Sequence, residues 1–403
     1  MITVKGKYNI AECFTDEIEH TAREQIKMMV NDPTFAGSKI RIMPDVHAGI
    51  GCTIGTTMTV GEKVSPSMVG VDIGCGMYAV ALGEAEVDLE SLDRVVHSLP
   101  SGHGVWQGET SASFDFTRLL CYKEIKRISY AACSLGTLGG GNHFIEMDRD
   151  EEGEFYLVIH SGRRYLGAQV AEHYIDVAMD QTADKEGYLR EKQTIIRDYK
   201  REGKDAEISS ALKKAESAWL CRRNAASRER SYLCGQALED YLHDLDVCVE
   251  FAARNREIMA DYILRKMALQ PKDAFHTIHN YIDVKHRILR KGAISAEKGE
   301  RVLIPINMRD GSFICVGKGN EDWNRSAPHG AGRLLSRANA RRQLSLEEYR
   351  REMRGIYTTS VGMNTIDESP MAYKSVHDIT RNIRPTCTIV KRLTPIYNFK
   401  AGN

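Results

Sequence analysis

Short apolar runs separated by glycines mark most of the first 165 residues. Residues 39–43, 53–60, 77–82 and 155–160 are runs of this kind, rich in Ile, Val, Met and Thr. Apolar runs of this length that are bounded by glycine are typical of β-strands joined by tight turns. The pattern therefore predicts a strand-rich first part of the chain.

The strand pattern returns after the middle of the chain. Residues 274–332 again alternate short apolar runs with glycines, and residues 384–403 have an extended character. Between them, residues 344–354 have helical composition, with Ser345 and Glu348 at the spacing of a capping box. We expect one helix here between two strand-rich segments.

Residues 166–269 have a different composition. No proline occurs between Pro100 and Pro271, glycine is sparse, and Ala, Leu, Glu, Lys and Arg dominate. Apolar residues recur at helical spacing, which predicts amphipathic helices that cover a core. Residues 197–214 are charged and broken by Gly203, so we expect a solvated connection between helices. A basic helical lobe that touches nucleic acid stays open as an alternative.

The order of these segments predicts the architecture. Strand-rich parts flank a helical part, which favours one α+β core of mixed β-sheets with flanking helices. We therefore expect a single domain over residues 1–403, with a mostly helical insertion at residues 166–269. No internal repeat or low-complexity tract is visible.

Composition narrows the class of protein. Lys and Arg number 55, and Asp and Glu also number 55, so any nucleic-acid site must be a local patch. Neither a membrane span nor a secretion signal is recognisable, so we expect a cytoplasmic protein that has no membrane partner. The ten cysteines form no CxxC pair, and most of them are expected to be reduced and buried.

Histidines and acids gather inside glycine-dense, otherwise apolar segments. These segments are MPDVHAGIGCTIG (43–55), VGVDIGCGM (69–77), LGTLGGGNHFIEM (135–147), VIHSGRRYLG (158–167), FHTIHNYIDV (275–284) and APHGAGR (327–333). Asp45 and His47 would face the same side of a strand, and Asp72 and Cys75 share a tight turn. A single histidine in such a place is more often a core residue than a ligand, but here several coincide.

Together these side chains suit a metal centre. One carboxylate, one thiol and three or more imidazoles can form the ligand shell of one or two divalent ions, because a thiolate can bridge two ions. Two neighbouring ions suit reactions in which phosphate oxygens attack and leave. Glycine-dense loops with Arg nearby suit phosphate, whereas a Walker A motif and a Rossmann fingerprint are absent from the sequence. The residues alone predict metal-dependent phosphoryl or nucleotidyl transfer.

The motifs, in this order, resemble those of the RtcB family of RNA-splicing ligases. Further matching motifs are HNY, RKGAISAEKGE, GNE and SPMAYK, so the resemblance covers almost the whole chain. It implies the α+β core peculiar to that family. It also implies a GTP-dependent RNA ligase that joins RNA 3′-phosphate or 2′,3′-cyclic phosphate ends to 5′-hydroxyl ends, in RNA repair or tRNA splicing.

The resemblance assigns metal ligands and a nucleophile. It implies that Asp72 and Cys75 bind metal, with Cys75 bridging two Mn²⁺ ions, and that His143, His160 and His279 complete the shells. Ligand softness alone would favour Zn²⁺, so manganese depends on the family. His329 matches the nucleophile that attacks the α-phosphate of GTP and holds GMP through a phosphorus–nitrogen bond. The GMP then passes to the RNA 3′-phosphate, and the 5′-hydroxyl of the second fragment displaces it.

The resemblance also implies nucleotide and RNA contacts. For GTP and GMP the matching residues are Asn142, His143, Phe144, Ile145, Glu146, His279, Asn280, Pro305, Ile306, Asn307, Met308, Ser312, His329, Gly330, Ala331, Gly332 and Lys400. Arg164 matches an arginine that contacts RNA phosphate. Other basic residues in or beside the motifs predict a local basic groove: Arg163, Lys291, Lys318, Arg325 and Arg333.

Departures from the family pattern suggest a divergent branch, specialised for the repair of one RNA. Ile50 replaces a common Lys, RRY at 163–165 replaces SRG, and PINM at 305–308 replaces PGSM. Two alternatives therefore stay open: a Mn²⁺-dependent cyclic phosphodiesterase without ligation, and a non-catalytic RNA-end-binding protein. The physiological RNA and the need for an archease-like activator protein are open as well.

Overall fold

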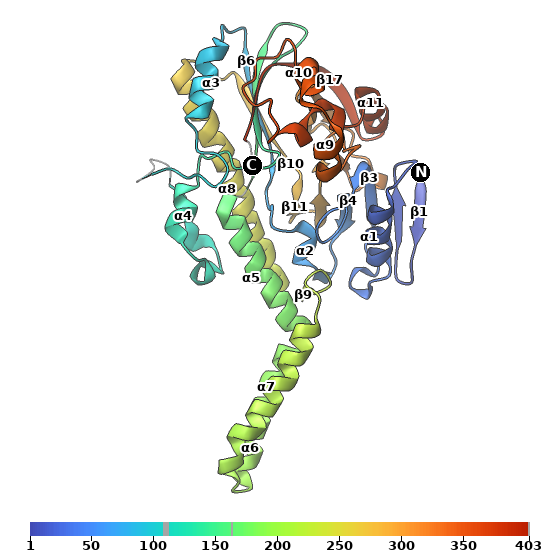
Figure 1. The fold of residues 1–403 in the computed structure, drawn as a ribbon. Coiled ribbons are helices and arrows are strands. Elements are labelled where there is room, and N and C mark those ends of the chain that lie inside the picture. Colours follow the sequence, from blue (N-terminus) through green and yellow to red (C-terminus); the bar gives the residue numbers. More distant parts are fainter. Residues whose placement is uncertain (108–112, 163, 402–403) are drawn as a thin grey trace.

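Two large β-sheets form the body of the molecule, and long helices run along one side of it (Figure 1). The computed structural model describes residues 1–107, 113–162 and 164–401, so Arg163 of the expected basic groove lies outside the described residues. None of the helices in these three ranges is long and apolar enough to cross a membrane.

The six-stranded sheet holds the N-terminal part of the chain. Its order is β1 (Ile2–Lys5), β2 (Ile10–Cys13), β3 (Ile40–His47), β4 (Ile54–Thr59), β12 (Ile288–Lys291) and β11 (Asn280–Asp283). Strands β2 and β3 are parallel, while the other pairs are antiparallel, so the sheet is mixed. Residues from before and after the long helices therefore share one sheet.

The seven-stranded sheet carries the candidate site. Its order is β10 (Asp273–Ile278), β6 (Gly76–Gly83), β8 (Phe155–Ser161), β7 (Phe144–Arg149), β17 (Cys387–Lys400), β15 (Gly311–Gly317) and β14 (Arg301–Asn307). The sheet curls until its edge strands meet, and the Leu303 amide on β14 donates to Thr277 Oγ1 on β10 at 2.9 Å. One face encloses an apolar cluster that includes Phe144 and Val158, and the other packs on helices.

Two pairs of short strands and several short helices complete the body. The strand pairs are β13 (Ala293–Ser295) with β16 (Ser326–Pro328), and β5 (Lys63–Val64) with β9 (Leu233–Cys234). The helices are α1 (His20–Val30), α2 (Pro66–Val69), α3 (Leu89–His97), α4 (Ile128–Cys133), α9 (Arg337–Gln343), α10 (Leu346–Glu352) and α11 (Val376–Ile383).

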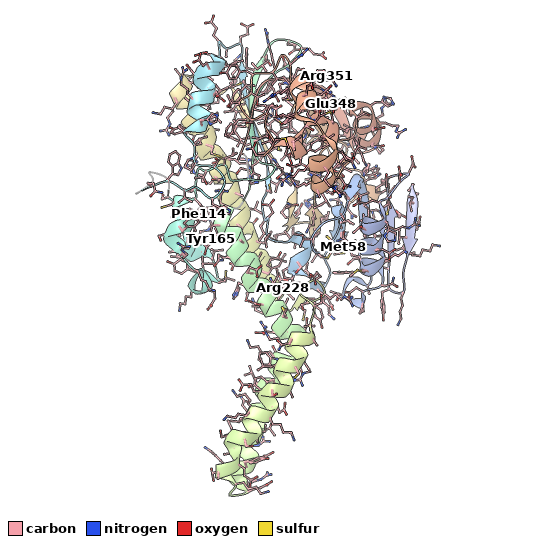
Figure 2. The ribbon with its side chains drawn as sticks, in the orientation of Figure 1. Met58, Phe114, Tyr165, Arg228, Glu348 and Arg351 are labelled. Carbon is pink, nitrogen blue, oxygen red and sulfur yellow. The ribbon has the colours of Figure 1, made fainter. Side chains whose placement is uncertain are left out.

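The middle of the chain forms four long helices. These are α5 (Arg164–Thr182), α6 (Lys185–Arg201), α7 (Ile208–Ala225) and α8 (Gln236–Met267). Helices α5 and α8 pack on each other, and α8 also packs on β6 and β8 of the seven-stranded sheet. Helices α6 and α7 project away from the body as an arm, beyond Arg228 at its base (Figures 1 and 2). Helix α8 is thus the element that links the arm side of the molecule to the sheet.

Most strands lie close to the apolar runs of the sequence. Strand β3 is longer than expected, because Pro44, Asp45 and Val46 continue it as buried residues up to His47. The expected connection at residues 197–214 is too long: α6 continues to Arg201 and α7 begins at Ile208. Lys and Glu have high helix propensity, so a charged segment can stay helical in solvent. Helix α10 begins after Ser345, whose Oγ accepts the Glu348 amide at 3.1 Å.

Candidate functional site

Asp72 and Cys75 lie in the turn between α2 and β6. This turn packs directly on α8, because a Cβ added to Gly74 (φ +74°) would lie 2.9 Å from Cβ of Ala252. A side chain at position 74 is therefore excluded by both the backbone conformation and the helix. The Gly74 amide donates to the Asn280 carbonyl at 2.7 Å, and the His279 amide donates to the Cys75 carbonyl at 2.9 Å. These bonds join the turn to the segment that carries His279.

Cys75 lies at the centre of a buried group of metal-ligating side chains. Its Sγ is 3.6 Å from Nε2 of His143 and 3.4 Å from Nε2 of His160. Nε2 of His160 is 3.4 Å from Nε2 of His279. Two ligand sets therefore share the thiol: Cys75 with His160 and His279, and Cys75 with Asp72 and His143. All five predicted metal ligands are brought together.

Hydrogen bonds at Nδ1, the ring nitrogen that faces away from Cys75, fix the orientations of two of these histidines. Nδ1 of His143 donates to the Leu138 carbonyl at 2.8 Å, and Nδ1 of His160 donates to the Asn142 carbonyl at 3.2 Å. These bonds leave Nε2 of each ring with a lone pair that faces Cys75. Burial lowers the pKa of His160 and of His279 well below the usual value, so both rings stay neutral at physiological pH. Neutral imidazoles, one thiol and one carboxylate fit one or two divalent transition-metal ions.

His329 directly follows β16 and is held by Asp45 on β3. Asp45 Oδ2 accepts both the ring Nδ1–H of His329, at 2.7 Å, and its backbone amide, at 3.1 Å. Asp45 is 2% exposed, so both bonds are shielded from water. Because Nδ1 carries the proton of this bond, Nε2 holds the lone pair. The ring centroid of His329 lies 5.1 Å from that of His279, so this imidazole borders the group around Cys75.

A cavity of about 400 Å³ opens beside these residues. The predicted nucleotide-binding residues that line it are Asn142, Phe144, Glu146, His279, Pro305, Ile306, Asn307, Met308, His329, Gly330, Ala331, Gly332 and Lys400. His160 and His47 line it as well. The cavity therefore joins the histidine at position 329 to one side of the metal-ligand group.

Four predicted nucleotide contacts do not line this cavity within the described structure: His143, Ile145, Asn280 and Ser312. His143 belongs to the metal-ligand group instead. Ile145 alternates with Phe144 and Glu146 on β7, so it packs in the apolar cluster with Ile263 of α8. Asn280 Oδ1 accepts the Gly292 amide at 3.0 Å. Ser312 is buried on β15, where it pairs with Pro305 of β14.

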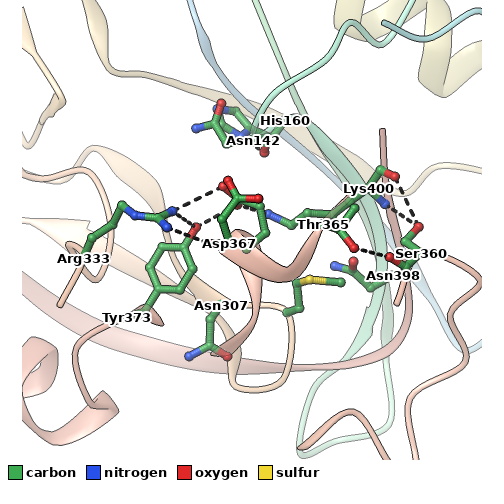
Figure 3. A network of polar contacts seen from close by, with 12 residues as sticks. Asn142, His160, Asn307, Arg333, Ser360, Thr365, Asp367, Tyr373, Asn398 and Lys400 are labelled. Atoms are coloured by element: carbon green, nitrogen blue, oxygen red, sulfur yellow. Dashed lines mark hydrogen bonds and ion pairs between the residues drawn. The ribbon is translucent and has the colours of Figure 1, made fainter. Parts of the chain in front are cut away.

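Charged side chains close the end of the cavity near Lys400. Lys400 Nζ lies 2.6 Å from Glu368 Oε2, and the Tyr373 hydroxyl donates to the same oxygen at 2.7 Å. Arg337 lies 2.6 Å from Glu368 Oε1. Burial alone would raise the pKa of Glu368, but Lys400 and Arg337 outweigh it and hold the pKa at about 2. Figure 3 shows Lys400 and Arg333 approaching this network from opposite sides, below Asn142 and His160.

Two buried carboxyl groups lie side by side on β7. Glu146 Oε2 accepts the Asn398 amide at 2.8 Å, while Glu146 Oε1 has no hydrogen-bond donor within the described residues. Asp148 follows two positions later on the same face of the strand. Burial, with Asp148 beside it, raises the pKa of Glu146 well above the usual value, and burial raises the pKa of Asp148 to about 7. Both carboxyl groups therefore favour the protonated form more than a carboxyl group in water does, and they titrate as a pair.

Comparison with known sequences bears on this site. A sequence model described as tRNA-splicing ligase RtcB matches residues 25–124 and 123–401. The chain belongs to the RtcB family. RNA-splicing ligase RtcB of Escherichia coli is 29% identical over 402 residues, which cover 89% of this chain and 89% of that protein. tRNA-splicing ligase RtcB of Archaeoglobus fulgidus is 28% identical over 444 residues, covering 93% of this chain and 90% of that protein.

A third relative extends the comparison. tRNA-splicing ligase RtcB of Aeropyrum pernix is 27% identical over 433 residues, covering 84% of this chain and 83% of that protein. The predicted RtcB membership and the predicted α+β class are therefore confirmed. In this RtcB chain the PINM segment leads into a turn, in which Asn307 Oδ1 accepts the backbone amides of Arg309 and Asp310, at 3.0 and 2.9 Å.

Arg164 lies on the other side of the metal-ligand group of this RtcB protein. It lines a second cavity, of about 610 Å³, together with Asp72, His143 and Tyr165. Its guanidinium donates to Thr137 Oγ1 at 2.7 Å and to the Gly102 carbonyl at 2.9 Å. The predicted metal ligands therefore lie between two cavities, one bordered by His329 and one by Arg164.

Sequence reasoning missed several residues of the RtcB site. The sequence pattern places Asp45 only beside His47 on a strand, whereas its contact with His329 spans 284 positions. Glu368 was not selected, although it directly precedes the SPMAYK motif that carries Tyr373. An acid beside a family motif was the signal that could have identified it. Arg337 lies four positions after Arg333 and outside the HGAGR motif, so the motif does not predict it.

Proposed function

We propose that this protein is an RNA ligase that uses GTP and Mn²⁺ to join RNA 3′-phosphate or 2′,3′-cyclic phosphate ends to 5′-hydroxyl ends. The single observation that carries this proposal is the placement of His329. Its imidazole is oriented by a buried carboxylate and borders both a nucleotide-sized cavity and the Cys75 group. The names of the RtcB relatives support RNA joining.

The first step is the attack of His329 on GTP. Nε2 forms a bond to the α-phosphorus, and the bond from that phosphorus to the oxygen of the β-phosphate breaks, which releases pyrophosphate. The substituted ring keeps its Nδ1 proton and becomes positively charged. Asp45 faces that proton at 2.7 Å, so its carboxylate stabilises the charge that develops on the ring. Asp45 also holds the tautomer that exposes the Nε2 lone pair.

The ligand group supports the choice of divalent ions. Asp72, Cys75, His143, His160 and His279 would hold them, because these side chains converge within a few ångströms and the rings of His160 and His279 are neutral. Bound divalent ions would neutralise phosphate charge near Nε2 of His329. The identity of the ion as Mn²⁺ depends on the family resemblance, since thiol and imidazole by themselves favour Zn²⁺.

The remaining steps transfer GMP and then release it. An oxygen of the RNA 3′-phosphate attacks the phosphorus bound to His329, so that the phosphorus–nitrogen bond breaks and RNA carries the guanylate. The 5′-hydroxyl of the second RNA then attacks the 3′-phosphate, loses its proton to solvent and displaces GMP. Arg164 lines the cavity on the far side of the metal ligands, where an RNA end can approach without crossing the nucleotide.

The nucleobase end of the cavity suits guanine. Glu146 Oε1 is a buried acceptor that has no donor within the described residues, and a guanine edge offers two adjacent N–H groups. Phe144 offers an apolar ring in the same cavity, and Lys400 lies 5.2 Å from its centroid.

We also propose that residues 1–403 act as one catalytic domain, since the ligands come from both sides of the long helices.

The experiment that tests this function is the intact mass of the protein after incubation with GTP and Mn²⁺. We expect a gain equal to one GMP in the wild type, none in His329→Ala, and an unchanged gain in His286→Ala. His286 is a matched control, because it forms the same contact with a carboxylate, Asp283, at 2.9 Å outside the cavity. A GMP adduct on His329→Ala would refute the assignment of the nucleophile. Opening of a cyclic phosphate without any adduct would favour the phosphodiesterase alternative.

A further inference from the structure

Helix α8 places two consecutive polar residues, Asn255 and Arg256, directly beneath the metal-ligand group. Both side chains are 0% exposed. A buried guanidinium is costly unless its donors are satisfied, and a buried amide requires partners for three or more bonds. Neither residue belongs to a motif that the family resemblance used. The role of these two buried side chains must therefore be inferred from the contacts that they make.

Arg256 bonds to the immediate neighbours of two predicted ligands. One terminal nitrogen, Nη1, donates to the Gly74 carbonyl and to the Ser161 carbonyl, each at 2.8 Å. Gly74 precedes Cys75, and Ser161 follows His160. One guanidinium thus fixes the backbone on both sides of the 3.4 Å contact between the Cys75 thiol and the His160 ring. Burial lowers the pKa of Arg256 only to about 10, so the side chain stays charged at neutral pH.

Asn255 reaches the third ligand through Leu138. Its Oδ1 accepts the amides of Gly136 and Thr137, at 2.7 and 3.0 Å, and its Nδ2 donates to Ser161 Oγ at 3.2 Å. Ser161 Oγ in turn donates to the Leu138 carbonyl at 2.7 Å. The same carbonyl accepts the Nδ1–H of His143. The orientation of the His143 ring therefore depends on a turn that Asn255 holds at two amides.

The packing around these bonds leaves little freedom. The Gly74 turn lies flush on α8, as described above, and a Cβ added to Gly162 would lie 2.9 Å from Asp72 Oδ1. Three turns that are distant in sequence thus meet one rigid helix. A site that is held in place before its ion binds does not spend binding energy on ordering its ligands.

We propose that Asn255 and Arg256 are positioning residues, which hold the three turns so that Cys75, His143 and His160 stand at ligand distance before the metal binds. The inference rests on the metal centre of the proposed function. It adds that the affinity for the ion is set in part by a helix that provides none of the ligands.

The test measures Mn²⁺ binding to the full-length protein, from the electron paramagnetic resonance signal of free Mn²⁺ during titration. The variants are Arg256→Lys, which keeps the charge but loses the planar fork, and Asn255→Ala. The matched control is Asp244→Asn on the same helix. Asp244 is equally buried and accepts the amides of Leu120 and Cys121, at 2.8 and 3.0 Å, which belong to a turn without predicted ligands. Melting temperatures in chelator report the stability of each metal-free variant.

We expect Arg256→Lys and Asn255→Ala to weaken Mn²⁺ binding by ~10–100-fold, which is the usual effect of losing a residue that orients a ligand. Asp244→Asn should lower the melting temperature in chelator and leave the Mn²⁺ affinity within about twofold. If Arg256→Lys bound Mn²⁺ with wild-type affinity, or if Asp244→Asn lost as much Mn²⁺ affinity as the two variants, the positioning role would be overturned. Either result would leave the proposed metal centre itself standing. If the wild type bound no more Mn²⁺ than Cys75→Ala, the metal centre itself would be refuted.

Discussion

The contact between Asp45 and His329 allows a quantitative prediction. In Asp45→Asn the shape of the side chain is kept, but the negative charge that faces Nδ1 of His329 is lost. The ring bond of 2.7 Å is short and shielded, as expected of a hydrogen bond to a charged group. Such bonds contribute about 1.5–3 kcal/mol. Because 1.4 kcal/mol corresponds to one factor of ten, loss of the charge should slow guanylylation by ~10–150-fold.

A larger effect is expected if the new amide turns its NH₂ group towards the ring. His329 would then have to accept at Nδ1 and carry its proton on Nε2, which removes the attacking lone pair. The equivalent Asp→Asn change in Ser–His–Asp hydrolases lowers the rate by ~10⁴, and this sets the upper limit. We therefore expect Asp45→Asn to slow guanylylation by a factor between about ten and about ten thousand.

The assay is the single-turnover rate at which radiolabel passes from α-labelled GTP to an excess of protein. Mn²⁺ affinity should stay at the wild-type value, because Asp45 is not among the ligand sets. Asp283→Asn is the matched control, since it removes the same charge from His286 and should label normally. Labelling of Asp45→Asn at the wild-type rate, with normal Mn²⁺ binding, would refute the role derived for Asp45.

Two further predictions concern metal and pH. Cys75→Ala should lose both ions and all ligation activity, because the thiol is shared by the two ligand sets. Metal analysis of the purified variant checks this, and full ligation activity would contradict the shared site. Glu368→Gln should lower the free energy of unfolding at pH 7 by about 3 kcal/mol, since the folded pKa of about 2 lies below the usual 4.5. This stabilisation is present above pH 4.5 and is lost towards pH 2, so urea unfolding at pH 3 should show a smaller difference; an equal difference at both pH values would contradict it.

The local elements were predictable because their causes are local. Apolar runs between glycines mark β4, β6 and β8 within one or two residues, since strand pairing needs only extended apolar segments there. Ser345 marks the start of α10 for the same reason. Where polar residues are buried, the pattern fails: Asp45 continues β3 because its partner is His329, which no local pattern can show.

The candidate site was predictable only in part. Glycine-dense clusters identified Cys75 and the histidines, and the resemblance supplied their grouping. Asn255 and Arg256 lie in the middle of α8, and nothing in the helical pattern distinguishes them from other positions of an amphipathic helix. Their role depends on carbonyl groups more than 90 positions earlier in the chain. Contacts of that range arise from the fold as a whole, so they leave no periodic signal in the sequence.

The pairing of β10 with β6 has a consequence for the chain as it is made. About 200 residues separate Cys75 from His279, and at ~5–20 residues per second the ribosome needs roughly 10–40 s to synthesise them. During this interval the thiol lacks the strand that later covers it, and an ion that arrives early meets only the ligands already made. The full ligand set of the proposed metal centre therefore exists only after residue 279 has been made, and the Cys75 thiol stays without this neighbouring strand until then.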